Sequence, residues 1–146
     1  MSTTIVPIIS SDTVGPLGVV HLPRLWSKLT LDAAGKLPAG FDACGDGFDA
    51  MTLKALGLDR AETIEYIKTQ KPTYVQFEEY IAKKHGGTVP KSAIDAHNAA
   101  VRGYNHSDEL GAKMRKDVGL QNENVKDAVT LNIIEDLHEL HANVTK

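Results

Sequence analysis

The chain has 146 residues, of which 42% are hydrophobic and 24% are charged, a composition that predicts one globular domain with its own apolar core. Its net charge of −3, without a stripe of Lys and Arg, argues against nucleic-acid binding, and no apolar run approaches the roughly 20 residues that span a membrane. The single cysteine, Cys44, and an N-terminus without the pattern of a signal peptide lead us to expect a cytoplasmic protein.

The N-terminal segment 1–16 contains two prolines and a short β-branched run, which together predict an extended arm ahead of a single helical domain at 17–146. The first helix is expected to begin at Pro23, because proline is favoured in the first turn, and to end at Gly35. Its buried stripe, at spacings of four residues, consists of Leu25, Leu29 and Ala33.

Residues 37–47 are rich in glycine and aspartate and predict a loop. Hydrophobic periodicity then predicts further helices, joined by short breaks at glycine and proline. The second helix is expected to be capped by Asp46 or Gly47 and to end at Gly57, and the third is capped by Asp59. The fourth is expected to run from Tyr74 to about Gly86, and the fifth from Pro90 through Tyr104. The sixth begins at Ser107 and ends at Gly119, and the final helix, capped by Asn124, covers about 125–142. We therefore predict an all-α fold, a compact orthogonal domain of six or seven helices with an extended N-terminal arm.

The segment His21-Leu-Pro-Arg24-Leu-Trp-Ser-Lys28 is followed by Ala-Ala-Gly-Lys-Leu at 33–37, by Phe-Asp at 48–49 and by Leu-Gly-Leu-Asp at 56–59. In these motifs the chain resembles a small bacterial family known as domain of unknown function DUF 5069. The resemblance covers roughly residues 20–85. It implies a compact bacterial helical domain and implies no activity.

Arg24 and Lys28 lie four residues apart on the first predicted helix, with Trp26 between them. Two neighbouring cations repel each other unless an anion lies between them, and the N-terminus of a helix favours an anion as well. The pair therefore predicts a clamp for a carboxylate or phosphate. The alternatives are a solvated surface stripe, or structural ion pairs with an acidic residue of the next loop, namely Asp42, Asp46 or Asp49.

Cys44 lies in the glycine-rich loop that leads into the next helix, and Asp49 follows it. Such a turn can present backbone N–H groups to an oxyanion, and a cysteine beside it can act as a nucleophile if its pKa is lowered. The loop lacks the Gly-Lys-Ser/Thr ending of a phosphate loop and the ligand order of a calcium loop. The alternative for Cys44 is a small buried hydrophobic residue.

His97 and Tyr104 are seven residues apart and are expected on one helical face, where they would form an acid–base pair near neutral pH. Asp49 is the third candidate catalytic residue, and Tyr74 is expected to line the same cavity. The alternative is a core histidine with its hydrogen bonds satisfied and an interfacial tyrosine.

The final helix contains Glu135, His138 and His141 at spacings of three residues. Helical di-iron sites need a second Glu-x-x-His copy, which is absent from the sequence, so we expect no metal site. The same helix is apolar around most of its circumference, which predicts a homodimer that packs through it.

Together these patterns predict a cofactor-free protein that binds a small anionic organic molecule and transforms it by lyase- or hydrolase-like acid–base chemistry. Neither nucleic acid nor membrane is an expected partner. The alternative is a non-catalytic module that binds a ligand or another protein.

Overall fold

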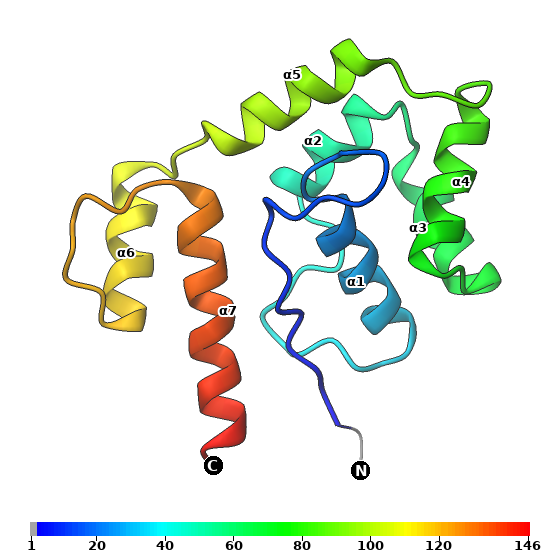
Figure 1. The fold of residues 1–146 in the computed structure, drawn as a ribbon. Helices are drawn as coiled ribbons and strands as arrows, with labels where there is room; N and C mark the ends of the chain where they lie inside the picture. The colour runs from blue at the N-terminus through cyan, green and yellow to red at the C-terminus, as the bar shows by residue number, and fades with distance from the viewer. Residues whose placement is uncertain (1–2) are drawn as a thin grey trace.

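The structure is a computed structural model that describes residues 3–146, so the first two residues of the predicted arm lie outside the described residues. The described chain contains helices and no β-strand, and its only β-bridge joins Asn105 to Asp127. The predicted all-α class is therefore confirmed. The helices are α1 (Leu22–Ala33), α2 (Phe48–Ala55), α3 (Arg60–Gln70), α4 (Tyr74–Lys84), α5 (Lys91–Arg102), α6 (Asp108–Val118) and α7 (Ala128–Val144) (Figure 1).

Local sequence signals set most of the helix boundaries. Pro23 lies in the first turn of α1, and Gly35 follows its end with a φ of +70°, a left-handed conformation that glycine adopts without strain. The side chains of Asp59 and Ser107 cap α3 and α6 by accepting backbone N–H groups of the first turn. Gly119 ends α6 with a φ of +75°.

Two predicted boundaries are wrong. Helix α5 ends at Arg102, because Gly103 terminates it, so Tyr104 lies beyond the helix and does not share a helical face with His97. Helix α7 begins at Ala128 because Asp127, not Asn124, is its cap: the Asp127 carboxylate accepts the backbone N–H three residues ahead.

Helix α1 is the centre of the main core and packs against α2, α3 and α4. Leu25 and Leu29 of its predicted stripe meet side chains of these helices that are almost fully buried, and this burial is the main favourable term for this part of the fold. Ala33, which was predicted to belong to the stripe, is exposed. Helix α4 begins with a capping box at Thr73 and Gln76. This capping box was not predicted from the sequence. The largest fully buried side chains of this core are those of Leu22, Leu25, Leu56, Phe77 and Ile81.

Helix α5 crosses from α2 to the hairpin formed by α6 and α7 (Figure 1). A second, smaller core joins the beginnings of α2 and α7 to α5, and it contains Val20, Phe48, Val101 and Ala128. The N-terminal arm runs between α7 and α1 in Figure 1, so two parts of the chain that are far apart in sequence face each other across it. None of the helices in residues 3–146 combines the length and the hydrophobicity needed to cross a bilayer.

Candidate functional site

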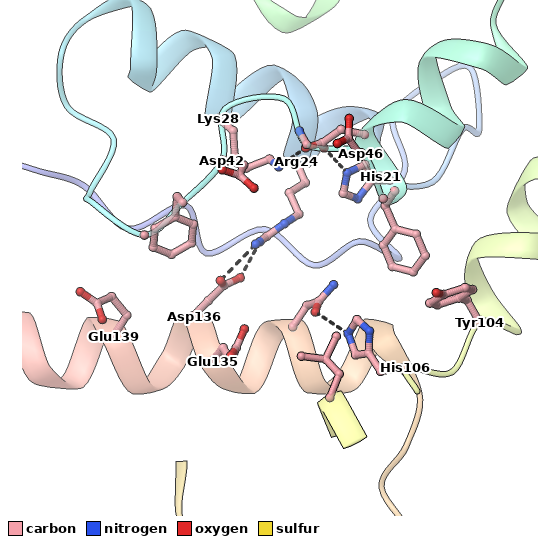
Figure 2. Close-up of a pocket in the computed structure, with 18 of the residues that line it drawn as sticks. His21, Arg24, Lys28, Asp42, Asp46, Tyr104, His106, Glu135, Asp136 and Glu139 are labelled. Carbon is pink, nitrogen blue, oxygen red and sulfur yellow. Dashed lines mark hydrogen bonds and ion pairs between the residues drawn. The ribbon is translucent and has the colours of Figure 1, made fainter. Parts of the chain in front are cut away.

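A cavity of about 690 Å³ separates the α1–α2 side of the molecule from the α6–α7 hairpin (Figure 2). Its lining comes from α1 and the residue before it, from the loop at 39–47, from the beginning of α2, from the link between α5 and α6, from α6, and from one face of α7. Sites for small organic molecules usually have volumes of about 300–1,000 Å³. The cavity is therefore large enough for such a ligand.

Asp49 is the centre of a buried polar network on the α1–α2 side of the cavity. His21 Nε2 donates to one of its carboxylate oxygens at 2.6 Å, and the ammonium group of Lys28 and the backbone N–H of Gly45 donate to the other at 2.5 and 2.8 Å. Burial raises the pKa of the Asp49 carboxyl, but the hydrogen bond and charge of His21 and the charge of Lys28 outweigh it and lower this pKa to about 2. Asp49 is therefore ionised and neutralises Lys28.

His21 holds this network in place from an unusual backbone position. Its φ of +71° is left-handed, a conformation that costs free energy for a residue other than glycine and needs support from its surroundings. The support includes the bond to Asp49 and a hydrogen bond in which Nδ1 accepts from the hydroxyl of Ser11 at 3.0 Å. Burial lowers the pKa of His21, and both nitrogens of its ring are engaged within the protein.

Arg24 connects three parts of the chain at the floor of the cavity. Its guanidinium donates to both carboxylate oxygens of Asp136 on α7, at 2.5 and 3.1 Å, and to the carbonyl oxygens of Pro7 and Ile9 in the arm, at 3.2 and 2.8 Å. Burial raises the pKa of Asp136, and the hydrogen bond and charge of Arg24 offset this only in part. Both charges are almost inaccessible to solvent, so either one would destabilise the fold strongly if it lost its partner.

The cavity lining carries a large excess of negative charge. Its two cations, Arg24 and Lys28, are both engaged in the ion pairs described above. Burial raises the pKa of Glu135, and the nearby carboxylates of Asp136 and Asp117 raise it further, as expected where negative charges crowd together. Two of the lining carboxylates pair with cations outside the lining, Asp46 with Arg60 and Asp117 with Lys113. The seven lining carboxylates are Asp42, Asp46, Asp49, Asp117, Glu135, Asp136 and Glu139.

Four of the predicted site residues meet at this cavity, namely Arg24, Lys28, Asp49 and Tyr104. His97 lies elsewhere: it is buried beneath α2, and its Nε2 donates to the carbonyl oxygen of Val20 at 3.1 Å. This is the environment of a core histidine whose hydrogen bond is satisfied, and burial lowers the pKa of its ring.

The remaining predicted ligand-binding residues, Trp26, Tyr74 and Cys44, are not among the residues that line the cavity. The indole of Trp26 packs edge-to-face on the Tyr74 ring at 5.9 Å and donates to the carbonyl oxygen of Pro72. The Tyr74 hydroxyl donates to Glu78. Burial raises the pKa of the Cys44 thiol, which is the opposite of the direction that an activated thiolate requires.

Three residues that shape the cavity were not predicted from the sequence: His21, Phe48 and Asp136. Asp136 carried a usable signal, because it is a charged residue in the middle of the apolar pattern of the last helix and such a residue needs a buried partner. His21 carried a weaker one, since it directly precedes the first turn of α1. Phe48 had no polar signal and resembled any core residue.

The predicted absence of a metal site concerns the same face of α7. Glu135 and His138 line the cavity, whereas His141 does not. In the described part of the chain, no three His, Cys, Asp or Glu side chains come together in an arrangement that would hold a metal ion.

Comparisons with protein-family models, with curated proteins and with solved structures found no significant match to this chain. They do not bear on the resemblance to DUF 5069, which stays a prediction.

Proposed function

We propose that the protein binds a small organic cation in the cavity between α1 and α7. One observation supports this above all: seven carboxylates line the cavity and three of them, Asp42, Glu135 and Glu139, form no ion pair in the described chain, whereas the two cations of the lining are already paired. In a partly enclosed space, such an excess of one charge attracts the opposite charge. A protonated amine is the simplest organic group of this kind.

The anionic ligand expected from the spacing of Arg24 and Lys28 is the competing hypothesis. To reach either cation, an anion has to displace Asp136 or Asp49 and leave a buried carboxylate without its partner. The ion pairs therefore support a structural role for both cations. Acid–base chemistry on the bound molecule stays a prediction, and among the residues proposed for it Asp49 and Tyr104 face the cavity.

The two hypotheses differ in the sign of the ligand charge, so a matched pair of probes separates them. Calorimetric titration with butylamine, which is protonated at neutral pH, is compared with titration with butyrate, an anion of the same size. We expect butylamine to bind and butyrate to show no saturable heat. Binding of butyrate alone, or of neither probe, contradicts the proposed function.

The double variant Glu135→Gln/Glu139→Gln tests whether binding occurs at these carboxylates, because both line the cavity from α7. We expect it to weaken butylamine binding by about tenfold or more, since a hydrogen bond to a charged group is worth about 1.5–3 kcal/mol. The matched control is Glu123→Gln, an exposed residue outside the cavity, which should leave the affinity unchanged. Equal affinities for both variants would place binding elsewhere.

The homodimer and the cytoplasmic location predicted from the sequence also stay proposals. The dimer is supported by three apolar side chains that are exposed along α7, namely Leu137, Leu140 and Val144. Analytical ultracentrifugation tests it: a dimer that dissociates in the Leu137→Glu variant is expected, and a monomeric wild-type protein at high concentration contradicts it.

A further inference from the structure

Four aromatic rings form a continuous wall at one end of the cavity. His21 packs edge-to-face on Phe48 with ring centroids 5.5 Å apart, Phe48 packs on Tyr104 at 5.7 Å, and Tyr104 packs on His106 at 6.0 Å. All four residues line the cavity. We call His21, Phe48, Tyr104 and His106 the aromatic wall.

Tyr104 is the exposed member of this wall, with 48% of its surface accessible, whereas His21 and Phe48 are buried. Its backbone is nevertheless fixed, because the carbonyl oxygen of Tyr104 accepts from the N–H of Ala128 and the next residue forms the bridge to Asp127. In the described chain its hydroxyl makes no side-chain hydrogen bond. A rigidly placed ring with an open surface in a cavity is typical of a binding site and contributes little to the core.

The aromatic wall and the unpaired carboxylates lie at different ends of the cavity. Figure 2 shows Tyr104 and His106 at one end of α7, and Glu135 and Glu139 progressively further along the helix. His106 is hydrogen-bonded to Asn132, and Glu139 is seven residues further on, so the two ends are about 10 Å apart along the helix axis at 1.5 Å per residue. A ligand that reaches both ends must be elongated.

We infer that the ligand is an amine with an aromatic group, joined by a short flexible chain: the ring packs against the aromatic wall, and the ammonium group lies among the carboxylates of Glu135 and Glu139. This inference rests on the proposed function and adds the identity of the second half of the ligand. Edge-to-face packing on Tyr104 gives selectivity for a flat aromatic ring over an aliphatic group of similar size.

Three amines of graded structure test the inference by calorimetry: butylamine, 4-cyclohexylbutylamine and 4-phenylbutylamine. We expect 4-phenylbutylamine to bind at least about tenfold more tightly than butylamine, and more tightly than the cyclohexyl compound. In the Tyr104→Leu variant this advantage should fall by roughly 2- to 10-fold, the range expected for one aromatic pair, and Tyr104→Phe should retain it. Both variants are expected to fold, because the side chain is half exposed, and circular dichroism checks this.

The outcomes separate the two proposals. If all three amines bind with equal affinity, or if Tyr104→Leu leaves the preference for the phenyl ring unchanged, the aromatic wall is not a ligand surface and the inference fails while the proposed function stands. If the cyclohexyl and phenyl compounds bind equally well, the recognition is apolar and not aromatic, which also overturns the inference. If no amine binds, the proposed function itself is wrong.

Discussion

Replacing Asp49 by Asn tests the buried network on which the α1–α2 side of the cavity depends. The substitution removes a charge but keeps the shape, so it leaves the ammonium group of Lys28 buried without an anion. Breaking a buried ion pair from one side typically costs 3–5 kcal/mol. Since domains of this size are stable by about 5–15 kcal/mol, the variant should unfold at a clearly lower urea concentration.

Part of the stability difference between the wild type and the Asp49→Asn variant should depend on pH. The pKa of Asp49 is lowered from 3.8 to about 2 in the folded protein, a shift of about two units that corresponds to roughly 2 kcal/mol. Because the folded-state pKa is the lower one, this stabilisation is present above about pH 4 and is lost as the pH falls towards 2. The Asn variant has no such titration, so the gap in stability between the two proteins should narrow by about 2 kcal/mol over this interval.

Urea denaturation of both proteins between pH 2 and 7, followed by circular dichroism, measures the gap directly. A second variant, Lys28→Met/Asp49→Asn, removes the unpaired charge and should recover part of the lost stability at neutral pH. Parallel stability curves for the wild type and the Asn variant would refute the assigned pKa shift. If the double variant is no more stable than Asp49→Asn, the broken ion pair is not the cause of the lost stability.

Four further substitutions test other parts of the fold by thermal or urea denaturation. Gly15→Ala should destabilise the protein by about 1–3 kcal/mol, because a Cβ there would lie 2.5 Å from side-chain atoms of α4. Gly111→Ala within α6 should be neutral or stabilising by up to about 1 kcal/mol, since only the flexible tip of the Arg115 side chain must move. Asp136→Asn should cost about 3–5 kcal/mol by leaving Arg24 buried without an anion, and an unchanged stability would contradict the role given to this pair. Thr73→Ala should cost about 1 kcal/mol through the loss of the α4 cap, and no change at all would mean that the capping box contributes nothing.

The parts of the fold that local chemistry controls were predictable from the sequence. Gly35, Asp59, Ser107 and Gly119 each mark a helix end through their own side chain or backbone freedom, and the structure has these ends where expected. The start of α7 was misplaced because several residues before it are capable caps, and only the hydrogen bond of Asp127 distinguishes them.

The composition of the site was predictable only in part, because its main contacts join residues that are far apart in sequence. Arg24 and Asp136 are separated by 112 positions, and no local pattern connects them. The pairing of Lys28 with Asp49 was one of the predicted alternatives, since Asp49 closely follows the loop after the first helix. The helical period placed His97 and Tyr104 on one face, but it does not apply beyond Arg102, where α5 ends.

The most direct test of a cation site between α1 and α7 is an NMR titration of the isotopically labelled protein with 4-phenylbutylamine. We expect saturable shifts of the backbone amide signals of Tyr104, Glu135 and Glu139, which line the two ends of the cavity. Signals of α3 and α4, on the opposite side of α1, should remain unchanged. Saturable shifts confined to α3 and α4, or no shifts at all, would contradict a cation site between α1 and α7.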